Sequence, residues 1–181
     1  MERDYLDKRI RKINNFPKPG IIFYDITTLF EDGQAFKKII DFISNQYRNK
    51  KIDKVVGIDA RGFLLASAIA YKLGAGISIV RKEGKLPYKA NKVSYRKEYG
   101  FDTIEMHNDT IKKNERIVIA DDLLATGGTM LATIDLVKKM GGCIVGIDFI
   151  IALSFLPGLE KLREKSYPVN YLIDYSSEEM K

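Results

Sequence analysis

The run Ile117-Val-Ile-Ala-Asp-Asp-Leu-Leu-Ala-Thr-Gly-Gly-Thr129 carries the most information about the fold. Its first four residues are all apolar, as in a strand that is buried on both faces. The pattern then changes to acidic, small, hydroxyl and glycine residues before an amphipathic segment begins at Met130. The run therefore predicts a strand, a loop and the start of a helix, in that order.

The loop between this strand and this helix has the composition of a phosphate site. Gly127 and Gly128 let the backbone approach a ligand closely, and Thr126 and Thr129 supply hydroxyl groups. The helix that follows directs its unpaired N–H groups and the positive end of its dipole at the loop. We expect a monophosphate to bind at the loop that Ala125 begins.

Two adjacent carboxylates, Asp121 and Asp122, lie at the carboxyl end of the strand, just before the loop. There they can accept hydrogen bonds from sugar hydroxyls or hold water on a divalent ion. The alternative is a buried strand that ends in a solvated turn, but a turn alone needs neither the acidic pair nor the Thr-Gly-Gly-Thr order. The pattern therefore indicates a sugar-phosphate site.

The segment Asp121–Thr129 resembles the donor-binding signature of the type I phosphoribosyltransferases, in the form typical of the members that use adenine. Further pieces of the same family pattern occur in the same order along the chain: Phe16–Phe23, Val56–Phe63, Arg81–Pro87 and Glu98–Gly100. The joint order of these pieces is far more specific than any one of them, and the resemblance extends over most of the chain.

Apolar periodicity predicts an alternation of helices and strands. Helices are expected at about Tyr5–Asn14, Gln34–Tyr47, Gly62–Leu73, Thr129–Met140 and Leu159–Lys165, and strands at Lys54–Ile58, Gly76–Arg81, Arg116–Ala120, Ile144–Ala152 and Asn170–Ile173. This alternation favours an α/β fold with a mainly parallel sheet, helices on both faces, and ligands beyond the carboxyl ends of the strands.

The domain prediction is a single phosphoribosyltransferase domain over residues 1–181. The polar stretch at about 83–105 does not follow the alternation, so we interpret it as a flexible hairpin or lid over the site. The resemblance also implies a small hood over the base, formed by about residues 16–30 and 153–181.

Composition narrows the classes of function. The single cysteine, Cys143, excludes an internal disulfide, and its apolar neighbours predict a buried thiol in a reducing, cytoplasmic protein. The charged N-terminus and the short apolar run Ile144–Leu156 predict neither a secretory signal nor a membrane span. The net charge of +6 is spread over the chain, so an anionic small substrate explains it better than nucleic acid does.

A second strand-to-helix turn, Asp59-Ala60-Arg61-Gly62-Phe63, carries an arginine at the start of the helix. Backbone N–H groups and a planar guanidinium suit the oxygens of pyrophosphate. In the family this loop binds pyrophosphate, often through a cis non-proline peptide, which by position would join Asp59 and Ala60. Taken alone, Arg61 is equally a surface residue paired with a carboxylate.

Three cations, Arg81, Lys82 and Lys85, follow the next strand and suit a departing pyrophosphate. A solvated charged loop is the alternative. The resemblance implies a homodimer in which Arg81 and Lys85 reach the neighbouring subunit's site, while Lys82 serves its own.

The resemblance assigns Glu98 as the general base that takes the ring proton of the purine, with Tyr95 and Tyr99 helping to close the lid. Without the resemblance, Glu98 is one of many exposed acids.

The base slot is assigned to Ile22, Phe23 and Leu153, because a purine needs a flat apolar slot with a few backbone hydrogen bonds at its edges. Core packing is the alternative for Ile22 and Leu153. Tyr24 departs from the family pattern, in which many adenine enzymes carry arginine, so contacts of the hood are expected to differ there.

The resemblance implies a purine salvage reaction: 5-phosphoribosyl passes from its pyrophosphate donor to adenine, giving AMP and pyrophosphate. Mg²⁺ is expected to bridge pyrophosphate and ribose hydroxyls, with no dedicated protein cage. The catalytic assignments are Glu98, Arg61 and Lys82.

Two alternatives stay open. A 6-oxopurine acceptor would need a donor to its O6 atom, and no lysine or arginine is assigned to the slot. A non-catalytic regulator that senses the donor would more commonly carry a DNA-binding module or a damaged lid. The sole histidine, His107, and the absence of a P-loop motif argue against zinc, triad and ATPase chemistry.

Overall fold

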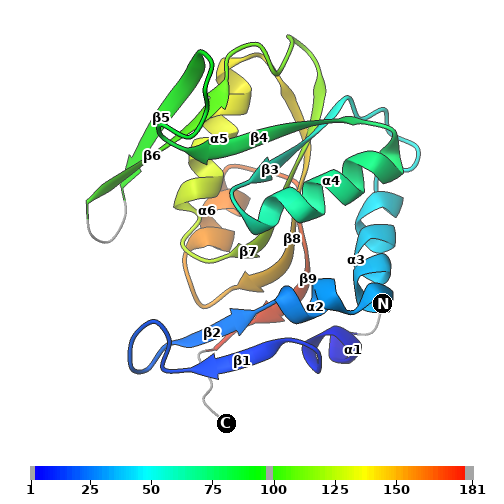
Figure 1. Cartoon of the computed structure of the whole chain (residues 1–181), viewed down its shortest axis with the longest axis vertical. Coiled ribbons are helices and arrows are strands. Elements are labelled where there is room, and N and C mark those ends of the chain that lie inside the picture. The colour runs from blue at the N-terminus through cyan, green and yellow to red at the C-terminus, as the bar shows by residue number, and fades with distance from the viewer. Residues whose placement is uncertain (1–2, 97–99, 178–181) are drawn as a thin grey trace.

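The centre of the molecule is a seven-stranded sheet with the strand order β5-β6-β4-β3-β7-β8-β9, and the computed structural model describes residues 3–96 and 100–177 (Figure 1). Five neighbouring strands are parallel: β4 (Gly76–Lys82), β3 (Lys54–Ile58), β7 (Arg116–Leu124), β8 (Cys143–Leu153) and β9 (Val169–Tyr175). The mainly parallel sheet predicted from the sequence is thus confirmed.

Helices cover both faces of this sheet, and each face has its own apolar cluster. One face packs against α3 (Gly33–Asn45) and α4 (Arg61–Leu73), and the other against α5 (Gly128–Lys139) and α6 (Gly158–Glu164). Side chains of β7 alternate between the two clusters, with Val118 in the first and Ile119 in the second. The apolar run that opens β7 is therefore buried on both faces, as predicted. Within the described residues, no helix is long and apolar enough to cross a membrane.

The predicted N-terminal helix Tyr5–Asn14 is wrong in its second half. The chain forms a short helix α1 (Arg3–Asp7) and then a strand β1 (Arg11–Asn14), which pairs antiparallel with β2 (Ile22–Asp25). Every residue of β1 is exposed, so no apolar periodicity marks it as a strand. Its conformation is set by pairing with β2, which local sequence does not reveal.

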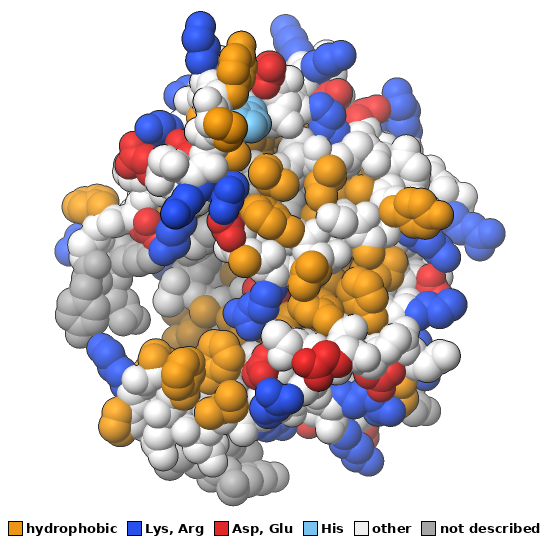
Figure 2. Space-filling model, in the orientation of Figure 1, with side chains coloured by type: hydrophobic (Ala, Val, Ile, Leu, Met, Phe, Trp, Pro, Cys, Tyr) orange, Lys and Arg blue, Asp and Glu red, His pale blue; other side chains and the backbone are white. Residues whose placement is uncertain are grey.

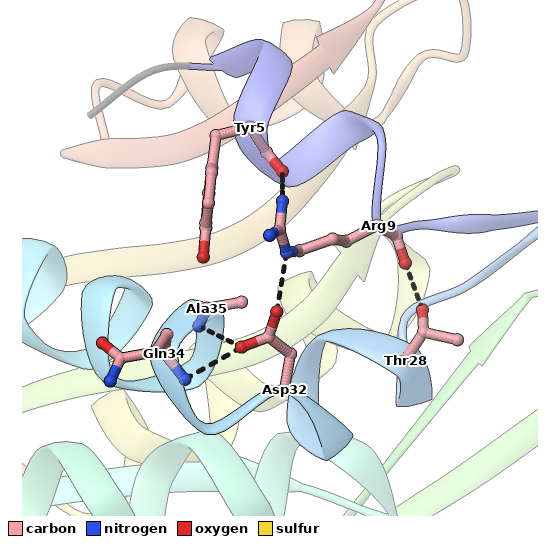
Figure 3. Close-up of polar contacts among 6 residues, drawn as sticks. All are labelled: Tyr5, Arg9, Thr28, Asp32, Gln34 and Ala35. Carbon is pink, nitrogen blue, oxygen red and sulfur yellow. Dashed lines mark hydrogen bonds and ion pairs between the residues drawn. The ribbon is translucent and has the colours of Figure 1, made fainter.

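This small two-stranded sheet is tied to the main body by a polar network around Arg9 (Figure 3). Arg9 Nε donates to Asp32 Oδ2 at 2.6 Å, and Arg9 Nη1 donates to the Tyr5 carbonyl at 2.9 Å. Asp32 Oδ1 also accepts two backbone N–H groups at the start of α3, so it caps that helix. Thr28, in α2 (Thr27–Glu31), donates to the Arg9 carbonyl. The network fixes the small sheet against α2 and α3.

The polar stretch that interrupts the alternation folds as an antiparallel hairpin of β5 (Ala90–Arg96) and β6 (Phe101–His107). The hairpin continues the main sheet, since β6 also pairs with the end of β4. The small β1–β2 sheet lies at the other side of the molecule, beyond β9 (Figure 1). The prediction of a buried thiol is wrong, because Cys143 is exposed at the first position of β8, where neither helical layer covers it.

A buried acid in β8 makes stability depend on pH. Tyr47 donates to Asp148 Oδ2 at 2.5 Å and Asn170 Nδ2 donates to Oδ1 at 3.2 Å, yet burial raises the pKa of Asp148 to about 7. The folded chain therefore holds this proton more tightly than the unfolded chain, whose carboxyl has an ordinary pKa near 4. As pH rises between these two values, unfolding releases the proton, and the free energy of unfolding falls.

We expect Asp148→Asn to remove this fall, because the amide has no proton to lose. The difference between variant and wild type should grow from pH 4 to pH 7 to at most about 4 kcal/mol, measured by urea unfolding at each pH. Asp135→Asn, at an exposed position of α5, is the matched control and should follow the wild type. Parallel pH profiles for wild type and Asp148→Asn would show that Asp148 is not the group responsible.

Candidate active site

The predicted site segments meet at one edge of the sheet. β4, β3 and β7 are parallel neighbours in the sheet, so their carboxyl ends lie side by side. The end of β4, the turn after β3 and the loop after β7 are therefore close together. The β7 strand extends further than predicted, to Leu124, because its pairing with β8 continues as far as Ala152. Asp121 and Asp122, predicted just after the strand, therefore lie within it, and pairing with β8 holds their backbone rigidly.

The turn after β3 is in direct contact with the acidic pair of β7. Arg61 Nη2 lies 2.9 Å from Asp122 Oδ2. The neighbouring Gly62 has no room for a side chain, since a Cβ would lie 2.7 Å from Asp121 Oδ1. The peptide between Asp59 and Ala60 is cis, as the resemblance implied. Glycine at position 62 thus lets the first turn of α4 approach β7, so that a guanidinium and two carboxylates meet.

Burial makes the two carboxylates hard to ionise. Desolvation is the largest cause that raises the pKa of Asp121, and the charge of Asp122 raises it further. Desolvation also raises the pKa of Asp122, against the opposing charge of Arg61. Because burial disfavours the charged form of both groups, a ligand that brings hydroxyl donors or positive charge would stabilise the carboxylates by binding them.

The loop from Ala125 to Thr129 is shaped by α6. Gly127 has φ +79° at the N-cap of α5, and a Cβ there would lie 2.9 Å from Gly158 Cα. A Cβ on Gly158 would lie 2.2 Å from the Ala125 carbonyl oxygen, which accepts a hydrogen bond from the Gly158 N–H at 3.0 Å. Sequence reasoning missed Gly158, because its contact with the loop depends on how α6 packs. Lys161 of the same helix donates to the Thr126 carbonyl at 3.3 Å.

The three cations after β4 differ in their contacts. Arg81 Nε pairs with Asp59 Oδ2 at 3.0 Å, in the turn after β3, and Arg81 Nη1 donates to the Lys85 carbonyl. Lys82 Nζ lies 3.6 Å from Asp102 Oδ2 of the hairpin, and its side chain is 67% exposed. In this arrangement Arg81 serves the turn of its own chain, and its reach into a neighbouring subunit stays a prediction.

Two of the residues assigned to the base slot, Ile22 and Phe23, project from opposite faces of β2. Phe23 faces the site, with the Arg61 guanidinium 5.6 Å from its ring centroid. Ile22 and Tyr24 project from the other face, and Tyr24 is buried in a stack on Tyr175 with ring centroids 4.1 Å apart. Tyr24, where many adenine enzymes carry arginine, therefore packs between the small sheet and β9.

Ile22 and Leu153 are both buried in the same apolar cluster, so core packing accounts for their side chains. A cavity of about 590 Å³ borders Ile22, Tyr24 and Tyr175, on the face of β2 away from Phe23. Of the three residues assigned to the slot, this cavity is bordered by Ile22 but not by Phe23 or Leu153. Glu98 and Tyr99 lie outside the described residues.

The residues described contain no group of three or more His, Cys, Asp or Glu side chains that could hold a metal ion. Asp121 and Asp122 supply carboxylate oxygens of the kind that Mg²⁺ prefers, but two side chains do not make a cage. The donor set fits a hydrated ion that arrives with a phosphate ligand.

The comparisons with known proteins agree with this arrangement. A sequence model of the family described as "Phosphoribosyl transferase domain" matches residues 27–176. The adenine phosphoribosyltransferase of Geotalea daltonii is 58% identical over 153 residues, which are 84% of this chain and 90% of that protein.

Solved structures give the same result. The crystal structure of adenine phosphoribosyltransferase from Thermoanaerobacter pseudethanolicus has a TM-score of 0.90 and 41% identity, and the match covers 96% of this chain and 100% of that one. The Trypanosoma brucei enzyme, in complex with AMP, pyrophosphate and ribose-5-phosphate, has a TM-score of 0.87 and 30% identity, with 95% and 78% covered. The chain belongs to the adenine phosphoribosyltransferases of the phosphoribosyl transferase domain family.

Proposed function

We propose that this protein transfers 5-phosphoribosyl from 5-phosphoribosyl-1-pyrophosphate to adenine, forming AMP and pyrophosphate in purine salvage. The contact that carries the proposal is the ion pair of 2.9 Å between Arg61 and Asp122, which joins the turn assigned to pyrophosphate to the carboxylates assigned to ribose. The phosphate loop begins directly after the same strand. One edge of the sheet thus presents groups for all three parts of the donor.

Each group has a separate task. The N–H groups of the loop at Ala125–Thr129 hold the 5′-phosphate, and Asp121 and Asp122 accept from the ribose hydroxyls. Arg61 and Lys82 bind the leaving pyrophosphate, which gains negative charge as its bond to the ribose breaks. Mg²⁺, when bound with the donor, would screen the negative charge of pyrophosphate beside the acidic pair. The residues thus hold donor and base in line while the charges separate.

The proposal keeps Glu98 as the general base and the β5–β6 hairpin as the lid. The described part of the hairpin supports this, because Tyr95 in β5 lies 2.8 Å from Thr129 in the phosphate loop. The strand that carries Tyr95 therefore lies against the site, and Glu98 follows the described end of that strand in the sequence. Phe23 remains the proposed apolar wall of the base slot, with the backbone of Ile22 and the Leu153 end of β8 beside it.

Thr129→Val should raise the apparent Michaelis constant for the donor about tenfold or more, and that for AMP in the reverse reaction similarly. The reason is the lost hydrogen bond to a charged phosphate, since valine keeps the shape but not the hydroxyl. The constant for adenine should hardly change. Steady-state kinetics with each substrate varied in turn tests this prediction. An equal rise in the Michaelis constant for adenine would indicate general damage to the loop.

The experiment that tests the function is a product assay with separate bases. The purified protein is incubated with Mg²⁺, the donor and either adenine, hypoxanthine, guanine or xanthine, and the nucleotides are separated by chromatography. We expect AMP from adenine with one pyrophosphate per turnover. Faster formation of a 6-oxopurine nucleotide would favour the alternative acceptor, and donor binding without any product would favour the regulator.

We also propose that the protein is a homodimer in the cytoplasm. Hydrophobic side chains gather between α4 and α2 on the face shown in Figure 2. There a cavity of about 520 Å³ is bordered by six residues, and among them Tyr71 is 89% and Leu64 is 51% exposed. Exposed apolar surface of this kind is typical of association, and a second copy is the occupant we propose. Sedimentation should give twice the chain mass of 20.6 kDa, and the single mass would contradict the dimer.

A further inference from the structure

A tyrosine of the hairpin touches the phosphate loop directly. The Tyr95 hydroxyl lies 2.8 Å from Thr129 Oγ1, in the first turn of α5. The Tyr95 ring lies against Gly128, where a Cβ would come within 2.9 Å of ring atom Cδ2. The contact thus requires glycine at position 128, and it places a hydroxyl of the hairpin beside the threonine assigned to the 5′-phosphate.

The direction of this hydrogen bond matters, because each hydroxyl has one proton to donate. The Tyr95 hydroxyl can donate instead to Asp102 Oδ2, at 3.4 Å, and Asp102 is an ion-pair partner of Lys82. The contact with Thr129 is shorter than the contact with Asp102 and has the usual length of an O–H···O bond. If Tyr95 donates to Thr129, the threonine proton is left for a third group, and a phosphate oxygen in the loop is a strong acceptor.

We propose that Tyr95 is a positioning residue that directs the Thr129 hydroxyl proton at the 5′-phosphate of the donor. The inference rests on the proposed function, in which the loop at Ala125–Thr129 holds that phosphate. Once the threonine donates to the phosphate, its oxygen becomes a better acceptor for the tyrosine proton, since hydrogen bonds in a chain polarise one another. Filling the phosphate loop therefore strengthens the contact that holds the hairpin over the site.

The first test is Tyr95→Phe, which removes the hydroxyl and leaves the ring against Gly128. We expect the apparent constant for the donor to rise about three- to tenfold, which is the usual effect of one neutral hydrogen bond. The turnover number should stay within about twofold, and the constant for adenine should not change. Calorimetry should show weaker binding of AMP but unchanged binding of adenosine, which lacks the phosphate.

A double-mutant cycle tests whether Tyr95 acts through Thr129. In the Thr129→Val background, Tyr95→Phe should have no further effect on the donor constant, because the hydroxyl has lost the group that it orients. Thr129→Ser keeps a hydroxyl and should keep the sensitivity to Tyr95→Phe. Independent effects that multiply in the double variant, or a donor constant unchanged in Tyr95→Phe, would overturn the inference.

Ser94→Ala is the matched control. Ser94 Oγ and Thr103 Oγ1 form a hydroxyl pair of 2.8 Å on the same hairpin, at an exposed position away from the phosphate loop. Its loss should leave the donor constant unchanged, whereas an effect equal to that of Tyr95→Phe would indicate general loosening of the hairpin and contradict the proposal. If the wild type forms no AMP, the proposed function itself is contradicted. If the wild type forms AMP and Tyr95→Phe has the same donor constant, only the role of Tyr95 is contradicted.

Discussion

Replacing Asp121 and Asp122 together with asparagine should lower the turnover number by at least about a thousandfold. Preorganised electrostatic groups are worth roughly a hundred- to a thousandfold each when removed, and both carboxylates face the ribose in our assignment. The amides keep the size of the side chains but lose the negative charge that stabilises a ribose becoming positive. Single-turnover kinetics at saturating donor and adenine measures the loss.

The same variant has a built-in control for folding. Burial raises the pKa of both carboxyls, which means that ionising them costs free energy in the folded chain. Neutral amides do not ionise, so the variant does not have this cost. The midpoint of thermal unfolding of the double variant should therefore be close to that of the wild type or higher, even though Arg61 loses its charged partner. A folded variant with more than a tenth of wild-type turnover would contradict the role of the acidic pair.

Glu98→Gln should reduce turnover about a hundred- to ten-thousandfold, while the fold and donor binding persist. Glutamine preserves the shape of the side chain but cannot take a proton from the purine, and general acid–base catalysis typically contributes a factor of this size. The residual rate of the variant should also lose the part of the acid limb of the pH–rate profile that is due to the Glu98 carboxyl. Rapid-quench kinetics under conditions where chemistry is rate-limiting gives the relevant rate.

Glu83→Gln is the matched control for this substitution. Glu83 follows the last residue of β4 and pairs with Lys92 of the hairpin at 2.8 Å, in a solvent-exposed position. Its variant should turn over adenine nearly as fast as the wild type. Near-normal turnover by Glu98→Gln would remove the general base and leave orientation and charge stabilisation as the whole mechanism.

The sequence correctly predicted those parts of the structure that depend on residues close together along the chain. The strand, the glycine loop and the helix start lie within one run of residues, so hydrophobic pattern and loop composition predict them together. The turn at Asp59–Phe63 was found in the same way. That these two segments meet follows from a general rule, because the ends of parallel strands gather at one edge of a sheet.

The errors arose where distant residues decide the structure. Residues 11–14 form a strand because residues 22–25 pair with them, although their own charges resemble those of a solvated helix. The end of β7 depends on how far β8 accompanies it, so the acidic pair, predicted just after the last residue of the strand, lies within the strand. The exposure of Cys143 depends on where the helical layers stop.

The supports of the phosphate loop could not be predicted for the same reason. Gly158 fits beneath Ala125 and Gly127 only because α6 folds back on the loop, and a Pro-Gly pair before a helix gives no local sign of that contact. Tyr95 reaches Thr129 across a separation of 34 residues. The sequence marked Tyr95 by resemblance but gave no partner for its hydroxyl.

The central claim is that this edge of the sheet holds the phosphoribosyl group, and calorimetric titration of 5-phosphoribosyl-1-pyrophosphate with Mg²⁺ tests it most directly. Wild type, Asp135→Asn and the Asp121→Asn/Asp122→Asn variant are compared at one pH and one ionic strength. We predict equal affinity for wild type and Asp135→Asn, and binding at least about tenfold weaker for the double variant, because ribose hydroxyls and the hydrated ion lose charged acceptors. Donor affinity of the folded double variant equal to that of the wild type would show that the carboxylates do not touch the sugar, and would contradict the account.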